Sequence, residues 1–127
     1  MTSPTTFTDT KEAFQAALRS LFSGKPDETE SDLSKLLSPE FKLRADDETF
    51  DFAAFATHVR WLRQNVPSVS LTIVQFIRDG NQLADRHMGE TILKDGTVKK
   101  SETFMFVEVA DDGRLSSIVE TVRQIEG

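Results

Sequence analysis

Three turn signals divide the C-terminal half of the chain into runs that resemble β-strands. Asp79-Gly80, Asp95-Gly96 and Asp111-Asp112-Gly113 each stand between stretches rich in Val, Ile, Thr and Phe. Glycine tolerates the positive φ of a tight hairpin, and aspartate can bond its own backbone. Such punctuation between strand-like runs is the strongest short-range hairpin signal. We therefore predict a meander of four antiparallel strands, at residues 69–78, 82–93, 98–109 and 114–123.

The residues before this meander carry the apolar spacing of three helices and one short strand. In residues 9–22 the apolar side chains recur every three or four positions, which gives a helix one buried stripe. Alternation at residues 41–44 is typical of a short strand. The predicted helices begin at Thr8 or Asp9, at Thr29 or Ser31, and at Asp51, and they end before Gly24, Pro39 and Pro67.

The predicted sheet should curl, because long antiparallel strands twist strongly. Three helices on its concave side would then enclose a space. We predict an α+β fold: a curved antiparallel sheet of one short strand and the four-stranded meander, with the helices covering the concave face, as a single domain over residues 1–127. A bulge at Gly89 would reverse the facing of the residues that follow it.

Composition argues against several classes of function. The chain has no cysteine, so thiolate chemistry, disulfides and cysteine-based zinc sites are excluded. A formal net charge of -6 argues against binding to duplex nucleic acid. No apolar run is long enough to span a membrane, and residues 1–6 lack the pattern of a secretory signal. We expect a cytoplasmic protein that needs no cofactor and binds neither nucleic acid nor membrane.

The order of elements resembles a known superfamily. Three helices, a short strand and a meander whose last strand reads GRLSSIVET (residues 113–121) are similar to the nuclear transport factor 2-like superfamily. The likeness covers residues 9–127 and is greatest to SnoaL-like polyketide cyclases, ketosteroid isomerases and limonene epoxide hydrolases. It implies that the curved antiparallel sheet and its helices form a cone-shaped α+β barrel. Inside this cone it implies an apolar pocket with a few polar residues at its deep end.

Three local similarities imply which residues face that pocket. Residues 83–88 (LADRHM) are similar to the epoxide hydrolase strand with an inward arginine, and residues 118–120 (IVE) to the strand that supplies one of its catalytic carboxylates. Residues 101–104 (SETF) are similar to the isomerase stretch with a protonated oxyanion-hole aspartate. The inward face implied by these resemblances consists of Arg86, Met88, Glu90, Glu102, Phe104, Phe106, Ile118, Glu120 and Val122.

The sequence also departs from these relatives. Met88 stands where the epoxide hydrolase has its second aspartate, and the position of the isomerase's general base falls near Arg44. The isomerase tyrosine has no counterpart, because the chain contains no tyrosine. Neither reaction carries over intact.

Carboxylates beside an arginine in an apolar pocket suit acid–base chemistry. Burial raises a carboxyl pKa, and an arginine between two carboxyls separates their roles. We expect Glu120 to be the base, Arg86 to orient it or the substrate, and Glu102 to donate a hydrogen bond, with Glu90 as a second candidate carboxylate. The alternative is a buried Arg–Glu network that only satisfies itself.

The two histidines are expected to lie in different places, one near the pocket and one away from it. His58 lies one helical turn before Trp61 and would close the pocket mouth as an acid or base, or else be a partly packed surface residue. His87 is expected on the convex face. No carboxylate stands at ligand spacing beside either histidine, so no metal site is predicted.

These residues predict a cofactor-free acid–base enzyme acting on an apolar, oxygenated small molecule. Isomerisation, cyclisation, dehydration and epoxide opening all fit, and the alternative is a noncatalytic module for ligand binding or dimerisation. A homodimer is expected through the convex face of the last three strands, where Leu83, Met105, Val107 and Val119 would otherwise meet water. The side chains expected to line the ligand, or else to form only core, are Phe55, Trp61, Met88, Phe104, Phe106, Ile118 and Val122.

Overall fold

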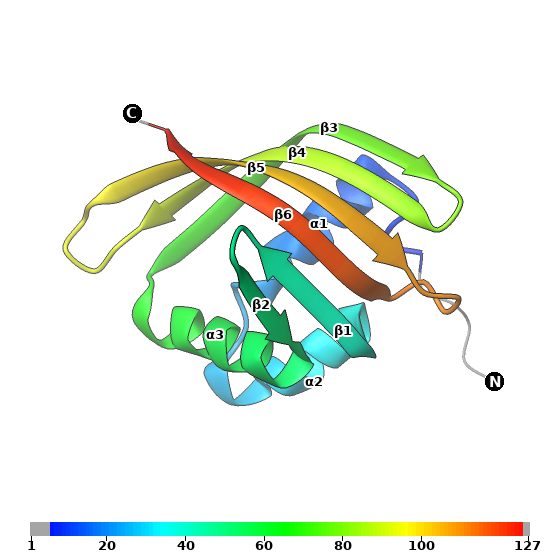
Figure 1. Ribbon diagram of the computed structural model, residues 1–127. Helices are drawn as coiled ribbons and strands as arrows, with labels where there is room; N and C mark the ends of the chain where they lie inside the picture. Colours follow the sequence, from blue (N-terminus) through cyan, green and yellow to red (C-terminus); the bar gives the residue numbers. More distant parts are fainter. Residues whose placement is uncertain (1–5, 126–127) are drawn as a thin grey trace.

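A computed structural model describes residues 6–125 of the chain (Figure 1). The expectation that no secretory signal is present concerns residues that mostly lie outside this range. No helix within residues 6–125 has both the length and the apolar character needed to cross a lipid bilayer. In chain order the elements are α1 (Lys11–Leu21), the 3-10 helix η1 (Pro26–Glu28), α2 (Thr29–Leu36), β1 (Leu37–Ala45), β2 (Glu48–Asp51), α3 (Phe52–Asn65), β3 (Ser68–Asp79), β4 (Gln82–Ile92), β5 (Val98–Val109) and β6 (Leu115–Ile125).

The three helices and the four-stranded meander are confirmed. The predicted cap of α3 is present, because the Asp51 carboxylate accepts a hydrogen bond from the Ala54 N–H at 2.8 Å. The cap of α1 differs from the prediction: the Thr10 hydroxyl accepts from the Ala13 N–H at 3.1 Å, so this helix begins slightly later than expected.

The sheet is mixed rather than purely antiparallel, and it curls without closing. Its strand order is β2-β1-β6-β5-β4-β3, and β1 pairs with β6 in parallel whereas the other neighbours are antiparallel. Figure 1 shows the long strands arching over the three helices. The α+β cone was therefore predicted correctly, while β2 and the parallel pairing were not.

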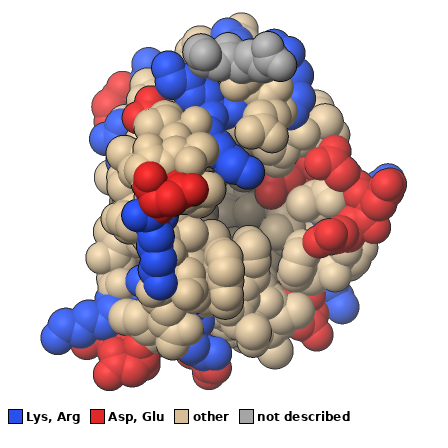
Figure 2. All heavy atoms as spheres, turned by 90° about the vertical axis from the view of Figure 1, so that its left-hand side faces the viewer, with Lys and Arg blue, Asp and Glu red and all other residues tan. Residues whose placement is uncertain are grey.

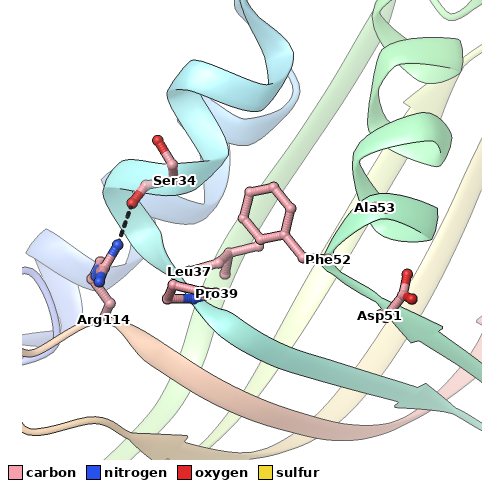
Figure 3. Close-up of a pocket in the computed structure, with 7 residues that line it drawn as sticks. All are labelled: Ser34, Leu37, Pro39, Asp51, Phe52, Ala53 and Arg114. Atoms are coloured by element: carbon pink, nitrogen blue, oxygen red, sulfur yellow. Dashed lines mark hydrogen bonds between the residues drawn. The ribbon is translucent and has the colours of Figure 1, made fainter.

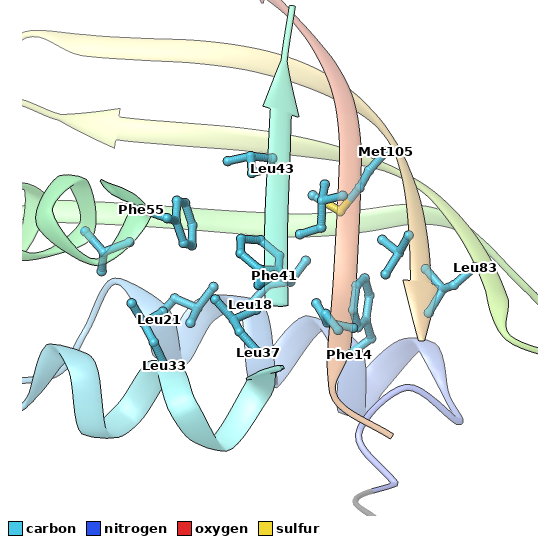
Figure 4. Close-up of a cluster of buried hydrophobic side chains, with 14 of the residues drawn as sticks. Phe14, Leu18, Leu21, Leu33, Leu37, Phe41, Leu43, Phe55, Leu83 and Met105 are labelled. Carbon is cyan, nitrogen blue, oxygen red and sulfur yellow. The ribbon is translucent and has the colours of Figure 1, made fainter. Parts of the chain in front are cut away.

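The hydrophobic core lies between the helices and the concave face of the sheet (Figure 4). The predicted stripe of α1 supplies Phe14, Leu18 and Leu21, all buried. Phe41 of β1 is fully buried and packs against Phe55 of α3 with ring centroids 5.6 Å apart. The apolar stripe of each helix thus anchors it to the sheet, which is the usual source of helix stability in a small domain.

The pairing of the sheet has three register shifts, which affect the side of the sheet that the following side chains face; one lies in β1, between Leu37 and Lys42. The other two lie in β3 and β6. One lies between Ile73 and Gln75 of β3, and the other leaves Ser116 of β6 without a partner on β5, because Leu115 pairs with Val109 and Ser117 with Glu108. No shift occurs at Gly89, where a bulge was predicted: β4 pairs with β5 without interruption. One extra residue in a strand moves the side chains that follow it to the opposite side of the sheet.

The inward face is consequently not the one implied by the local similarities. Beyond the bulge in β6, Ile118, Glu120 and Val122 do point inward as expected. On β4 and β5 the inward residues are Leu83, Asp85, His87, Gly89, Thr91, Ser101, Thr103, Met105 and Val107. The residues predicted inward on these two strands lie on the outer face: Arg86, Met88, Glu90, Glu102, Phe104 and Phe106.

Candidate functional site

A cavity of about 410 Å³ opens on the concave side, between the sheet and the helices α1 and α3. In Figure 2 it appears as a hollow in the middle of the face, with acidic side chains gathered on one side of it. Most of its wall is apolar, and core residues such as Leu18, Phe55 and Met105 form part of it. The polar groups of its lining are Glu48, His58, Ser70, His87, Thr91, Ser101, Thr103 and Glu120. An apolar hollow with a few convergent polar groups is typical of a small-molecule site.

His87 lines this cavity and is hydrogen-bonded to Asp85, which is buried and is not itself a lining residue. They are two residues apart on β4, so both side chains point inward, and they are only 5% and 7% exposed. His87 Nδ1 lies 3.0 Å from Asp85 Oδ1. Because a carboxylate only accepts hydrogen bonds, Nδ1 carries a proton. When the ring is neutral, the other ring nitrogen, Nε2, is an acceptor for the cavity that His87 lines.

Glu120 lines the same cavity from β6 and titrates near neutrality. Loss of hydration raises the pKa of Glu120 to about 7, the attraction of His87 opposes this rise, and repulsion from Asp85 and Asp46 adds to it. Asp46 is close because its backbone N–H donates to the Glu120 carbonyl at 3.0 Å. A carboxyl that is half ionised near pH 7 can serve as either acid or base there.

The predicted trio of Arg86, Glu102 and Glu120 is divided between the two faces of the sheet. On the outer face the nearly buried Glu102 carboxylate accepts from Arg86 Nη1 at 2.6 Å and from Arg123 Nε at 2.5 Å. These hydrogen bonds, Arg123 first and then Arg86, hold the pKa of Glu102 below its usual value. Glu102 is therefore an ionised acceptor outside the cavity, which agrees with the alternative of a self-satisfied network.

The other predicted residues are also divided. Phe55, Ile118 and Val122 line the cavity as expected, and His58 lies at its edge beside Phe50, with ring centroids 5.9 Å apart. The remaining candidates do not line it: Met88, Glu90, Phe104, Phe106 and Trp61. Phe106 is 70% exposed on the outer face and Trp61 is 54% exposed on α3.

Sequence reasoning missed the Asp85–His87 pair because it placed His87 on the convex face. The Asp-x-His spacing within a predicted strand was the available signal, since it puts both side chains on one face whichever face that is. Within residues 6–125 no three His, Asp or Glu side chains are grouped so as to hold a metal ion.

A second hollow, of about 470 Å³, lies between α2, β1 and the start of α3 (Figure 3). Its charged side chains are already engaged. Arg114 donates to Asp112 at 2.7 Å and to the Ser34 carbonyl at 3.0 Å, and Asp51 caps α3. This groove offers no acid–base group comparable to those of the concave cavity.

Comparison with known proteins supports the fold but does not identify an activity. No family model matches the chain. An uncharacterized protein of the fission yeast Schizosaccharomyces pombe is 26% identical over 116 residues, which cover 91% of this chain and 88% of that protein. An NTF2-like protein of unknown function from Exiguobacterium superposes with a TM-score of 0.71 at 14% identity, covering 96% of this chain and 100% of the other. A SnoaL-like family protein from Agrobacterium tumefaciens gives 0.66 at 13% identity, covering 89% and 97%.

Proposed function

We propose that the concave cavity binds an apolar small molecule and that a side chain of the cavity removes a proton from this molecule. The fold of the chain is that of the nuclear transport factor 2-like proteins. The observation that carries this proposal is the position of Glu120, a carboxyl with a pKa of about 7 that faces an apolar hollow beside His87. A general base is most effective when its pKa lies near the working pH.

The roles follow from the hydrogen bonds on the wall. Glu120 acts as the general base. His87 is a positioning residue: Asp85 fixes its ring, and in the neutral ring Nε2 accepts a hydrogen bond from a donor group of the substrate. Isomerisation, aldol-type cyclisation and dehydration each require removal of a proton near an oxygen function, so all three suit this arrangement. Arg86 and Glu102 have no part in it, because they lie on the other face of the sheet.

The proposal can be tested with a probe molecule that reacts when a base in an apolar pocket removes its proton. In 5-nitrobenzisoxazole, removal of the ring C–H proton breaks the N–O bond and releases a coloured nitrile phenolate. We expect the protein to accelerate this elimination, with a rate that rises with pH through about 7 as Glu120 ionises. Glu120→Gln should lower the rate more than tenfold, since positioned bases contribute about 10²–10⁴-fold.

Glu90→Gln is the matched control, because Glu90 is an exposed carboxylate on the outer side of β4, and it should leave the rate unchanged. Equal rates for wild type and Glu120→Gln would contradict the catalytic role and favour a noncatalytic binding module.

We also propose that the protein is a homodimer through the outer face of the sheet. Leu83, Met105 and Val107, expected at this contact, are buried in the core. Instead, Ile77, Ala84, Phe106 and Val119 stand opposite one another across four neighbouring strands, and Ile77, Phe106 and Val119 are exposed. Contiguous apolar side chains on a surface commonly mark an interface.

We expect wild type to sediment as a dimer at micromolar concentration and Phe106→Asp to sediment as a monomer, because a carboxylate in this row would have to be desolvated. A wild-type monomer under these conditions would contradict the proposed dimer.

A further inference from the structure

We propose that the cavity is selective for an organic cation, such as a protonated amine on an apolar body, over neutral and anionic molecules of the same shape. This inference rests on the proposed function and adds the charge class of the ligand. Its first support is the charge of the wall: Glu48 and Glu120 line the cavity, Asp46 and Asp85 lie behind or beside them, and no lysine or arginine is among the lining residues in the part of the chain described.

The basic side chains on the surrounding elements are committed elsewhere or lie at the edge. Arg19 of α1 donates to the Leu71 carbonyl at 2.7 Å, and Arg63 of α3 donates to the Leu21 carbonyl at 2.9 Å and to Asp32 at 3.0 Å. Lys99 shares the inward register of β5 but is exposed at the end of that strand, opposite Thr91. The interior of the cavity is therefore an environment in which a cation is favoured and an anion is repelled.

His87 supplies an independent observation. It is more than nine-tenths buried, its Nδ1 is engaged with Asp85, and no residue from 6 to 125 forms a hydrogen bond with its Nε2. With the His87 ring neutral, Nε2 and an ionised Glu120 are both acceptors, so the complementary ligand group must carry at least two donors. A protonated primary or secondary amine has them, whereas an ether, a ketone or a carboxylate has none.

Such a ligand would also change the state of Glu120. A cation beside a carboxyl favours its ionised form, which opposes the effect of burial on the pKa of Glu120. At pH 6 the free protein holds this proton and the complex would release it. Binding of the amine would therefore convert Glu120 into an ionised base in the same step.

Three molecules of one shape test the inference: 1-naphthylmethylamine, 1-naphthalenemethanol and 1-naphthoate, titrated into the full-length protein by calorimetry. At pH 7.5 we expect the amine to bind at least tenfold more tightly than the alcohol, and the carboxylate to bind most weakly. Glu120→Gln should bring the amine to the affinity of the alcohol, while Glu90→Gln should not. In buffers of different ionisation enthalpy, amine binding should release close to one proton at pH 6 and almost none at pH 8.

The outcomes separate this inference from the proposed function. If the alcohol binds as tightly as the amine while the elimination of 5-nitrobenzisoxazole still depends on Glu120, the charge selectivity is wrong and the acid–base role stands. Binding of 1-naphthoate that is tighter than binding of the amine also overturns the charge selectivity and leaves the acid–base role in place. If none of the three molecules binds and the elimination is absent, both proposals are wrong.

Discussion

Glu120→Gln should make the protein more stable than wild type above pH 7, by at most about 3 kcal/mol. Burial raises the pKa of Glu120 in the folded protein from its ordinary value of 4.5 to about 7. The stability that comes from the bound proton is therefore fully present below pH 4.5 and is lost as pH rises through about 7. A shift of one pKa unit corresponds to about 1.4 kcal/mol, so the difference between the two pKa values of Glu120 corresponds to about 3 kcal/mol. Partial exposure of the Glu120 side chain lowers this free energy.

The measurement is a urea titration of both proteins at several pH values from 4 to 8. The amide is neutral throughout, so the difference in unfolding free energy between variant and wild type should grow with pH and level off above 7. Groups titrated equally in both proteins, such as the low-pKa Glu102, cancel in this difference. Glu90→Gln, which makes the same substitution at an exposed position on the outer side of β4, is the matched control. A flat difference for Glu120→Gln would show that Glu120 is well hydrated and would weaken its assignment as a base.

The fold could be predicted from the sequence because its signals are local. Each Asp–Gly turn fixes a hairpin where it stands, and the apolar stripe of α1 depends only on spacing within one helix. The strand β2 was missed because its four residues, Glu48–Asp51, carry no periodic pattern and are mostly exposed. The parallel pairing of β1 with β6 joins segments more than seventy residues apart, and no local spacing reports it.

The candidate site was only partly predicted because one unpaired residue in a strand decides which side of the sheet the following side chains face. An unbulged hairpin between β5 and β6 would put Phe104 and Phe106 on the face of Glu120, as the sequence interpretation supposed. The unpaired Ser116 shifts the register, so Glu120 stands opposite Met105 instead. The usable signal was the pair Leu115 and Ile118, two buried apolar residues three positions apart, a spacing that a strand without a bulge does not give.

Two neighbouring residues of β5 provide a direct test of this register. Met105 is 6% exposed on the concave side and Phe106 is 70% exposed on the outer side. We expect Met105→Ala to cost about 2–3 kcal/mol of unfolding free energy, at the lower end of the range for buried side chains because Met105 borders the cavity. Phe106→Ala should stay within about 0.5 kcal/mol, although it removes the larger side chain.

The comparison is made by urea unfolding at concentrations low enough for the monomer, so that the proposed dimer contact through Phe106 does not contribute. Because the two residues are adjacent, both substitutions act on the same strand and share its backbone environment. The opposite order, with Phe106→Ala the more damaging, is what the unbulged register requires. That result would return Arg86 and Glu102 to the side of Glu120 and would remove His87 from the cavity.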